Sequence, residues 1–289
     1  MTDDPFATHR SLLFTVAYEM LGSAADAEDV VQETWLRWAD VDRAEVRDPR
    51  AYLLRIVTRQ ALNLLRTLTR RREEYVGEWL PEPLPTSPDL AEDVELAESI
   101  SIAMLTVLET LAPAERAVFV LREVFDMPYA DIAGTVDKTP AAVRQIAHRA
   151  RDHVAARRPR IQVDRAEHRR VVERFLAALR SGDLQVLLDV LAPEVVLVAD
   201  GGGEVAAFRR PVVGRERVAS LLSRFRTLAP DAVVGSVSLN GAPAGRIELA
   251  GELDTAVTFV VADGRISRIY AIRNPHKLAR LDEEATLSR

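Results

Sequence analysis

Four prolines stand within thirteen residues of this chain, between residues 77 and 89, and they divide the sequence into two parts. A proline lacks the backbone N–H and has a fixed φ, so neither a helix nor the interior of a sheet can run through this segment. The segment also carries acidic residues and no basic one. We therefore predict an extended acidic linker, with folded parts before and after it.

The residues on both sides of this linker show the spacing of amphipathic helices, with apolar side chains recurring every three or four positions. Gly22 ends the first helix, Ser23 caps the second, and Asp48 precedes a proline at the start of the third. The expected helices are 6–21, 24–39, 50–75, 90–111, 113–125, 129–136 and 140–158. This part of the chain is predicted to be entirely helical.

After residue 164 the pattern changes to a mixture of helical spacing and period-two runs separated by Gly, Pro and Asn-Gly. The expected helices are 167–179, 184–191 and 216–228. The expected strands are 195–199, 232–239, 245–249, 253–262 and 266–272. Three helices with about five mostly antiparallel strands predict a compact α+β domain.

Charge is distributed unevenly, although the net charge is only −6. Residues 49–72 contain seven arginines and no acid, whereas residues 76–112 contain eight acids and no basic residue. Residues 138–160 then carry seven basic residues and one acid. A single cationic stretch is most simply a solvated helix face, but two of them flanking an acidic connector indicate nucleic-acid binding.

The strongest local pattern is a short helix at 129–136, a turn, and a second helix opened by Thr139 and Pro140, which together predict a helix-turn-helix. Its exposed face includes arginine and glutamine, which pair with base edges in the major groove. The candidate DNA contacts are Thr139, Arg144, Gln145, His148, Arg149 and Arg151, the last of these to phosphate. A plain helical hairpin with a charged face is the alternative.

The arginine-rich helix at 50–75 is a second candidate, since its guanidinium groups can contact phosphates. Gln60, Asn63, Arg66 and Thr67 could touch single-stranded or melted DNA. An arginine-rich surface helix on an acidic protein is the alternative interpretation.

Three blocks in this order resemble regions 2 and 4 of extracytoplasmic-function (ECF) RNA polymerase sigma factors: DAEDVVQETWLRWA (26–39), DPRAYLLRIVTRQALNLLR (48–66) and LAPAERAVFVLREVFDMPYADIAGTVDKTPAAVRQIAHRAR (111–151). The linker EWLPEP (78–83) and the motifs DGGGE (200–204) and NPHKL (274–278) resemble the SigJ type, which adds a SnoaL-like domain.

This resemblance implies a multidomain fold. Two all-α sigma domains, a region 2 helical bundle at 1–75 and a region 4 helix-turn-helix at 101–160, would flank a Pro-rich linker at 76–100. A cone-shaped α+β domain of the SnoaL-like, NTF2-like fold would occupy 164–289. The implied activity is promoter-specific transcription initiation, with core RNA polymerase and promoter DNA as partners.

The resemblance also implies roles for particular residues. The residues implied to bind polymerase are Asp29, Gln32, Glu33, Trp35 and Leu36. Ordinary core packing is the alternative for Trp35 and Trp38, and we expect at least one of the two to be a core residue. The residues implied to capture the melted −10 strand are Arg59, Gln60, Asn63, Arg66 and Thr67. The residues implied to read the −35 element are Arg144, Gln145, His148 and Arg149.

A regulatory role in cis is expected for the C-terminal domain, acting on the helical modules or on the linker. The expected interdomain residues are Trp79, Leu80, Pro81, Asp200, Gly201, Gly202, Gly203, Asn274 and Pro275. The glycines permit a tight turn near a partner surface, or form a simple loop. The family's motifs usually carry lysine where Glu204 stands and aspartate where His276 stands, so contacts that need those charges are in question.

Two alternatives concern the C-terminal domain, which could bind a small-molecule effector in a pocket or act as a cyclase-type enzyme through Asp200, Asp254, Arg273 or His276. We expect no catalytic residue, cofactor or metal. The chain has no cysteine, no leader-like start and no apolar run long enough to span a bilayer, so we expect a cytoplasmic protein without membrane contact.

Overall fold

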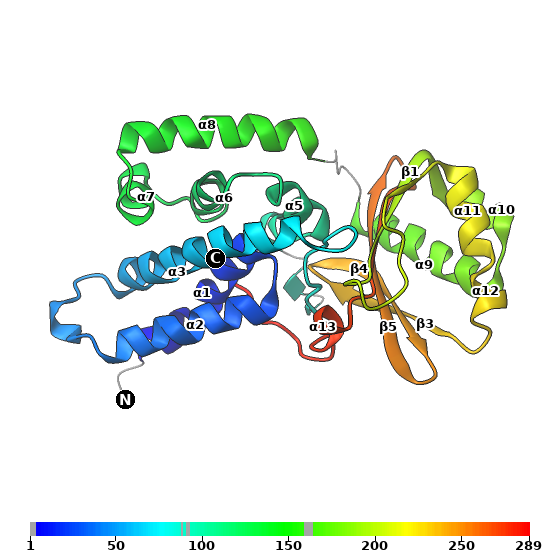
Figure 1. Cartoon of the computed structure of the whole chain (residues 1–289), viewed down its shortest axis with the longest axis horizontal. Helices are drawn as coiled ribbons and strands as arrows, with labels where there is room; N and C mark the ends of the chain where they lie inside the picture. Colours follow the sequence, from blue (N-terminus) through cyan, green and yellow to red (C-terminus); the bar gives the residue numbers. More distant parts are fainter. Residues whose placement is uncertain (1–3, 88, 91–92, 159–163) are drawn as a thin grey trace.

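The computed structural model describes residues 4–87, 89–90, 93–158 and 164–289. A helical part and a C-terminal α+β domain lie side by side along the long axis of the molecule, and the linker passes between them (Figure 1). The chain end returns to the helical part (Figure 1), where the backbone N–H of Ser288 donates to the Thr15 hydroxyl at 3.1 Å. Within the described residues, no helix is long and apolar enough to cross a membrane.

The helical part follows the predicted pattern closely. Gly22 ends α1 in the left-handed conformation, and the Ser23 and Thr139 side chains cap α2 and α8. Its elements are α1 (Pro5–Leu21), α2 (Ala24–Ala39), η1 (Arg43–Glu45), α3 (Pro49–Glu73), α4 (Val94–Ser99), α5 (Ile102–Leu108), α6 (Pro113–Phe119), η3 (Val120–Val124), α7 (Tyr129–Val136) and α8 (Pro140–Arg157).

Two predicted helices of the helical part differ in the structure. The helix expected over 90–111 is two short helices in its described portion, because the Ser101 hydroxyl accepts from the backbone N–H of Met104 and starts α5 anew. Residues 91 and 92 of that prediction lie outside the described residues. The helix expected over 113–125 continues from α6 into a π-helical turn at η3. Neither change was visible in the spacing of apolar residues.

Apolar side chains from α1 through α8 share one continuous core. It includes Tyr18 and Trp38, which are fully enclosed, and Leu287 from the far end of the chain, which is 8% exposed. The two helical modules expected from the sequence therefore pack against each other in this conformation. The expected boundary after residue 160 falls outside the described residues.

The C-terminal domain contains one six-stranded sheet in the order β2-β1-β6-β5-β4-β3, with helices packed on one face. Its elements are α9 (Arg165–Ser181), α10 (Leu184–Val190), β1 (Leu191–Asp200), β2 (Val212–Val213), α11 (Arg215–Ser223), α12 (Phe225–Leu228), β3 (Val233–Leu239), β4 (Ala242–Leu249), β5 (Glu252–Ala262), β6 (Arg265–Ile272) and α13 (Pro275–Leu278). The fold class expected from the sequence is confirmed.

Two details of the sheet were not predicted. Strand β2 was missed because it has only two residues, and β1 begins at Leu191, which was expected to end a helix. All neighbouring strands are antiparallel except β1 and β6, which pair in parallel. This pairing places the ends of β1 and β6, at Asp200 and Ile272, side by side.

The two faces of the sheet have different neighbours, as the alternation of side chains along a strand requires. Val257 and Phe259 of β5 pack towards α9, whereas Ala256 and Val260 face the opposite way. That second face is covered by Ile102 of α5 and by apolar residues of the linker and α13. The sheet is therefore buried between its own helices and the helical part.

The linker is extended, as predicted, but it is also buried. Leu80, Glu82, Leu84 and Thr86 are each at most 5% exposed. Pro85 forms an isolated bridge with Leu239 at the end of β3. The linker therefore contacts all folded parts of the chain.

Candidate nucleic-acid interface and interdomain contacts

The residues expected to bind polymerase lie on the outward face of α2. Trp35 and Leu36 are 48% and 52% exposed, which is high for large apolar side chains. Asp29 and Gln32 are also exposed, and Glu33 is half-buried and bound to Arg37 at 3.1 Å. In contrast Trp38 is buried and its indole N–H donates to Asp4 at 3.1 Å. The two tryptophans thus divide into one surface and one core residue.

The residues expected to capture the −10 strand follow one side of α3. Arg59, Asn63, Arg66 and Thr67 are exposed, and Arg66 donates to the Asn63 side chain at 3.2 Å. Gln60 is partly buried, and its Nε2 has no hydrogen-bond partner among the described residues. The structure thus brings these five residues onto one helix face.

Arg59 joins this face to the helix-turn-helix. Its guanidinium donates to the carbonyl oxygens of Gly134 and Thr135 at 2.9 and 3.3 Å, and to the Asp137 carboxylate at 2.9 Å. These acceptors lie at the C-terminal end of α7, where a helix favours a positive charge. One candidate −10 residue is therefore held by the module expected to read the −35 element.

The candidate −35 residues occupy the exposed side of α8. Thr139 caps the helix, and Arg144, Gln145 and His148 are exposed next to its N-terminal half. His148 lies 3.0 Å from Asp152 on its own helix. These four residues form a surface of the kind that enters a major groove.

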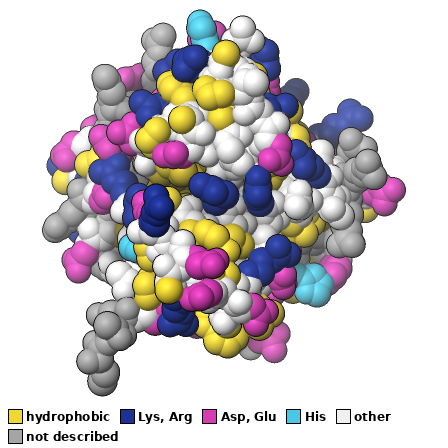
Figure 2. Space-filling view, turned by 90° about the vertical axis from the view of Figure 1, so that its left-hand side faces the viewer, with side chains coloured by type: hydrophobic (Ala, Val, Ile, Leu, Met, Phe, Trp, Pro, Cys, Tyr) yellow, Lys and Arg dark blue, Asp and Glu magenta, His cyan; other side chains and the backbone are white. Residues whose placement is uncertain are grey.

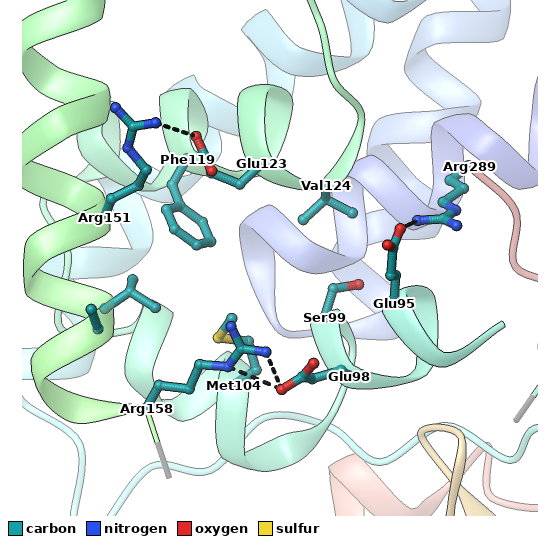
Figure 3. A pocket seen from close by; sticks show the side chains of 12 residues that line it. Glu95, Glu98, Ser99, Met104, Phe119, Glu123, Val124, Arg151, Arg158 and Arg289 are labelled. Carbon is teal, nitrogen blue, oxygen red and sulfur yellow. Dashed lines mark hydrogen bonds and ion pairs between the residues drawn. The ribbon is translucent and has the colours of Figure 1, made fainter. Parts of the chain in front are cut away.

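The remaining two candidates turn towards other helices. Arg149 approaches Glu115 of α6 at 3.5 Å, and Arg151 approaches Glu123 at 3.8 Å. Figure 3 shows Arg151 in the wall of a pocket between α8, η3 and α4–α5, with its guanidinium directed towards Glu123; on another side of this pocket Arg158 pairs with Glu98. Arg151 lies two turns after Arg144 on the same side of α8, but in this conformation its side chain turns towards Glu123.

Positive charge gathers at the end of the helical part opposite the C-terminal domain. In this view, Lys and Arg side chains lie across the middle of the surface, and hydrophobic and acidic side chains border them (Figure 2). A local cationic surface of this kind can contact phosphates although the whole chain is acidic.

The C-terminal domain is tied to the linker by one buried carboxylate. Asp200, at the end of β1, is 0% exposed and accepts hydrogen bonds from the Tyr75 hydroxyl at 2.6 Å, the Leu80 backbone N–H at 2.9 Å and Lys277 Nζ at 2.6 Å. Asn274 Nδ2 donates to the Tyr75 hydroxyl oxygen at 2.8 Å. We call these five residues the Asp200 cluster.

Two cations and an aromatic ring complete this contact. The Trp79 ring contacts both cations: Lys277 Nζ lies 4.1 Å from the ring centroid, and the Arg72 guanidinium carbon lies 3.7 Å from it. Burial lowers the pKa of Lys277 to about 8, although the charge of Asp200 acts in the opposite direction. Trp79 thus connects α3, the linker and α13 through cation–π contacts.

Two glycines of the loop after β1 stand where a side chain would not fit. Gly202 has φ +68, and a Cβ there would lie 2.7 Å from the Asn274 side chain. A Cβ on Gly201 would lie 2.2 Å from the carbonyl oxygen of Val205. A larger residue at position 202 would therefore push the loop away from Asn274, and one at position 201 would clash with the backbone of the loop itself. Pro275 follows as the first residue of α13 and is exposed.

The two departures from the family's motifs face each other. His276 Nε2 lies 2.9 Å from Glu204 Oε1, on the exposed rim of the Asp200 cluster. The resemblance described above implies lysine and aspartate at these positions, which would place the base and the acid the other way round. The exchange therefore keeps an acid opposite a base.

A second interdomain contact was missed by the sequence reasoning. Asn240, in the β3–β4 turn, is 1% exposed; its Oδ1 accepts from Leu84 N at 2.9 Å. Its Nδ2 donates to the Tyr18 hydroxyl at 2.7 Å and to the Ile100 carbonyl at 2.8 Å. The Asn-Gly dipeptide predicted the turn, but nothing in the sequence indicated that its side chain would bind the linker and two helices. We call these four residues the Asn240 cluster.

Glu82 of the linker caps α2. Its Oε2 accepts from the backbone N–H of Ala24 and Ala25, at 2.7 and 3.4 Å, and from the Ser23 hydroxyl at 3.2 Å. Burial raises the pKa of Glu82, whereas these hydrogen bonds lower it in part. A buried anion at a helix N-terminus satisfies N–H groups that the helix itself leaves without partners.

We expect Glu82→Ala to lower the free energy of unfolding by about 1–3 kcal/mol, because the Ala24 N–H would be buried without its acceptor. Urea denaturation measures the loss, and amide hydrogen exchange locates it at the start of α2. The matched control is Glu78→Ala, which removes a linker glutamate that makes no hydrogen bond within the described part of the chain. Equal stability of both variants would contradict the capping role.

Comparison with known proteins places these features in a family. Residues 6–71 match the Sigma-70 region 2 family, and residues 101–154 match the Sigma-70 region 4 family. These ranges contain the candidate −10 and −35 residues, respectively.

Full-length relatives cover the C-terminal domain as well. The chain is 36% identical to the ECF RNA polymerase sigma factor SigJ of Mycobacterium tuberculosis, across 94% of this chain and 91% of that protein. It is 33% identical to the probable ECF sigma factor SigI of the same species, across 96% and 94%. The crystal structure of M. tuberculosis SigJ superposes with a TM-score of 0.77, covering 96% of this chain and 98% of that one. The chain therefore belongs to the ECF RNA polymerase sigma factors.

Proposed function

We propose that this protein binds core RNA polymerase, directs it to promoters, and is regulated in cis by its C-terminal domain. In this proposal, residues 1–75 bind polymerase and the −10 strand, and residues 101–160 read the −35 element. The linker at 76–100 sets their separation, and residues 164–289 act on the linker.

The observation that carries the proposal is the burial of the linker between the promoter-binding modules and the C-terminal domain. The side chains of Asp200 and Asn240 accept hydrogen bonds directly from the backbone N–H groups of Leu80 and Leu84. A domain that holds the connector of two DNA-binding modules can control their spacing without touching DNA.

The conformation described here must open before it can engage a promoter. Elements centred at −35 and −10 are about 25 base pairs apart, which is roughly 85 Å along B-form DNA. In this structure the two modules share a core, and Arg59 binds the end of α7. Simultaneous promoter contacts therefore require these modules to separate, and polymerase supplies surfaces that hold them apart.

Run-off transcription tests the central claim. The full chain, mixed with core RNA polymerase and a library of genomic fragments, is expected to start RNA synthesis from a specific subset of fragments. Core enzyme alone is the control for background initiation. If the chain neither binds core polymerase nor changes the fragments transcribed, the proposed function is wrong.

We expect Arg144→Ala to weaken promoter binding by the holoenzyme by about 1–3 kcal/mol and to relax the preference at one base of the −35 element. The reason is that Arg144 is exposed at the N-terminal half of α8, where side chains reach base edges. Affinity for a set of single-base promoter variants measures this. The control Arg157→Ala changes a residue at the end of the same helix. If both variants lose the same affinity for every promoter sequence, Arg144 contacts a phosphate and does not read a base.

The geometry supports a non-catalytic role for the C-terminal domain. Asp200 is occupied within the interdomain cluster, and His276 is exposed next to Glu204. Asp254 and Arg273 line a cavity but bind each other at 2.7 Å. The four residues weighed for acid and base catalysis therefore do not gather around one substrate position. A cavity without such a pair fits a binding role better.

A further inference from the structure

The C-terminal domain contains a largely apolar cavity of about 370 Å³ that is partly open to solvent. Strands β1, β4, β5 and β6 form one side, and α9, α11, α12 and the loop at 206–208 form the other. Phe175 and Phe225 lie in its wall, and Leu228 and Phe208 line it while 78% and 42% exposed. This size lies near the lower end of the roughly 300–1,000 Å³ typical of small-molecule sites.

The polar residues of the cavity include an ion pair. Arg273 donates from Nε and Nη2 to the two oxygens of Asp254, at 3.1 and 2.7 Å, and from Nη1 to the Ala206 carbonyl oxygen. Burial alone would raise the pKa of Asp254, but hydrogen bonds from Arg273 and Thr255 lower it by more. Asp254 is thus an anion already matched by a cation.

This pairing defines what the cavity can recognise. An arginine has five N–H donors, and its contacts with the described residues use three of them. The remaining donors can bind an acceptor oxygen. A ligand carboxylate would find no uncompensated positive charge here, since Asp254 already neutralises Arg273, and burying an unmatched anion is costly.

The same residues adjoin the Asp200 cluster. Ala199 lines the cavity and precedes Asp200, and Arg273 lines it and precedes Asn274. The backbone N–H of Arg273 donates to the Asp200 carbonyl oxygen at 2.7 Å. A change in the position of Arg273 therefore acts directly on the two strand ends that hold the linker.

We propose that this cavity binds an uncharged, largely apolar small molecule through an acceptor oxygen, such as that of a ketone or an ester. We further propose that a bound ligand alters the hydrogen bond by which Asp200 holds the linker at Leu80. The second part rests on the proposed regulation in cis. The first part stands on the cavity alone.

Calorimetry with the full chain tests the binding site. Methyl nonyl ketone and benzophenone serve as uncharged probes, and decanoate is an anionic probe similar in length to the first. We expect at least one ketone to bind saturably, at least tenfold more tightly than decanoate. Absence of saturable binding by both ketones, or equal or tighter binding of decanoate, would overturn the proposal.

Two variants of exposed residues test whether the ketone binds in this cavity. Leu228→Ser changes an exposed apolar residue that lines it, and Val233→Ser changes one, 61% exposed, that does not. The first is expected to weaken ketone binding at least fivefold, and the second to leave it unchanged. Equal effects would place the ligand elsewhere and overturn the assignment.

Hydrogen exchange at the Leu80 amide, which donates to Asp200, tests the coupling. We expect a bound ketone to change its exchange rate at least threefold, whereas amides in the middle of α8 stay unchanged. Binding without a change at Leu80 would overturn the coupling but not the sigma-factor function. Failure of run-off transcription would overturn that function whatever the cavity binds.

Discussion

Asp200→Ala is expected to release the C-terminal domain from the linker and to lower the free energy of unfolding by about 3–5 kcal/mol. The carboxylate is fully buried and binds Tyr75, Leu80 and Lys277. Its removal leaves the Lys277 ammonium, with 11% of its side chain exposed, without its counter-charge. We proposed above that the conformation described here must open before it engages a promoter, and this cluster stabilises that conformation. We therefore also expect Asp200→Ala to increase run-off transcription.

The measurements are urea denaturation, hydrogen exchange across residues 77–87, and transcription with core polymerase. Glu248→Ala is the control, since it removes a surface partner of Arg246 in the same domain and should cost about 1 kcal/mol or less. The double variant Asp200→Leu with Lys277→Met should be more stable than Asp200→Ala, because it leaves no buried charge unpaired. If Asp200→Ala keeps the stability of the wild type and the same slow hydrogen exchange across residues 77–87, the proposed role of the cluster is refuted.

Glu19 is expected to make the stability of this protein fall as pH rises from about 4.5 to about 8. Burial raises the pKa of this α1 carboxyl from 4.5 to about 8, although Ser99 and Arg116 oppose the shift. The folded state therefore retains a proton that the unfolded chain loses above pH 4.5. Stability is greatest below the unfolded pKa and decreases until the folded pKa is passed, by at most about 1.4 kcal/mol per pH unit.

The surroundings of Glu19 are those of a buried carboxyl group that is neutral. The Ser99 hydroxyl donates to Glu19 Oε1 at 2.7 Å, whereas Oε2 has no partner among the described residues. Arg116 is 1% exposed and directs its Nε to the Glu19 carbonyl and its Nη1 to Glu109. The Arg116 charge is thus shared with a second carboxylate.

Glu19→Gln should remove this pH dependence, because an amide does not titrate. Subtracting the two denaturation series at pH 5, 6, 7 and 8 cancels the contributions of all other groups that both proteins share. We expect the variant to gain stability relative to the wild type at each step, while the exposed-face change Gln32→Glu leaves the slope unaltered. A difference that is constant over this range would contradict a raised pKa.

Local sequence signals predicted most of the secondary structure because they act over a few residues. Gly22, Ser23 and Thr139 end or cap helices in the structure at the positions expected from their side chains. The strand runs at 253–262 and 266–272 match β5 and β6 to within one residue. Errors occurred where the pattern was too short, as in the two-residue β2, or where a cap such as Ser101 divided a continuous apolar spacing.

The candidate site was predictable in part for the same reason. Residue type and helical spacing were enough to place Arg144, Gln145 and His148 on one exposed face. They could not reveal that Arg59 binds the end of α7, some 75 residues away in sequence. They also could not reveal that the Arg151 side chain turns towards Glu123, because the position of Glu123 depends on how η3 packs.

The sequence by itself determined two helical modules, an α+β domain and an extended linker, since proline chemistry, helix caps and apolar periodicity are properties of neighbouring residues. Only the tertiary structure decided that the linker is buried and which side chains hold it. Asp200, Asn240 and Glu82 are polar residues that a sequence places on a surface by default, and each is at most 4% exposed here. Their partners come from other parts of the chain, so hydrogen bonding that compensates their burial exists only once the whole molecule has folded.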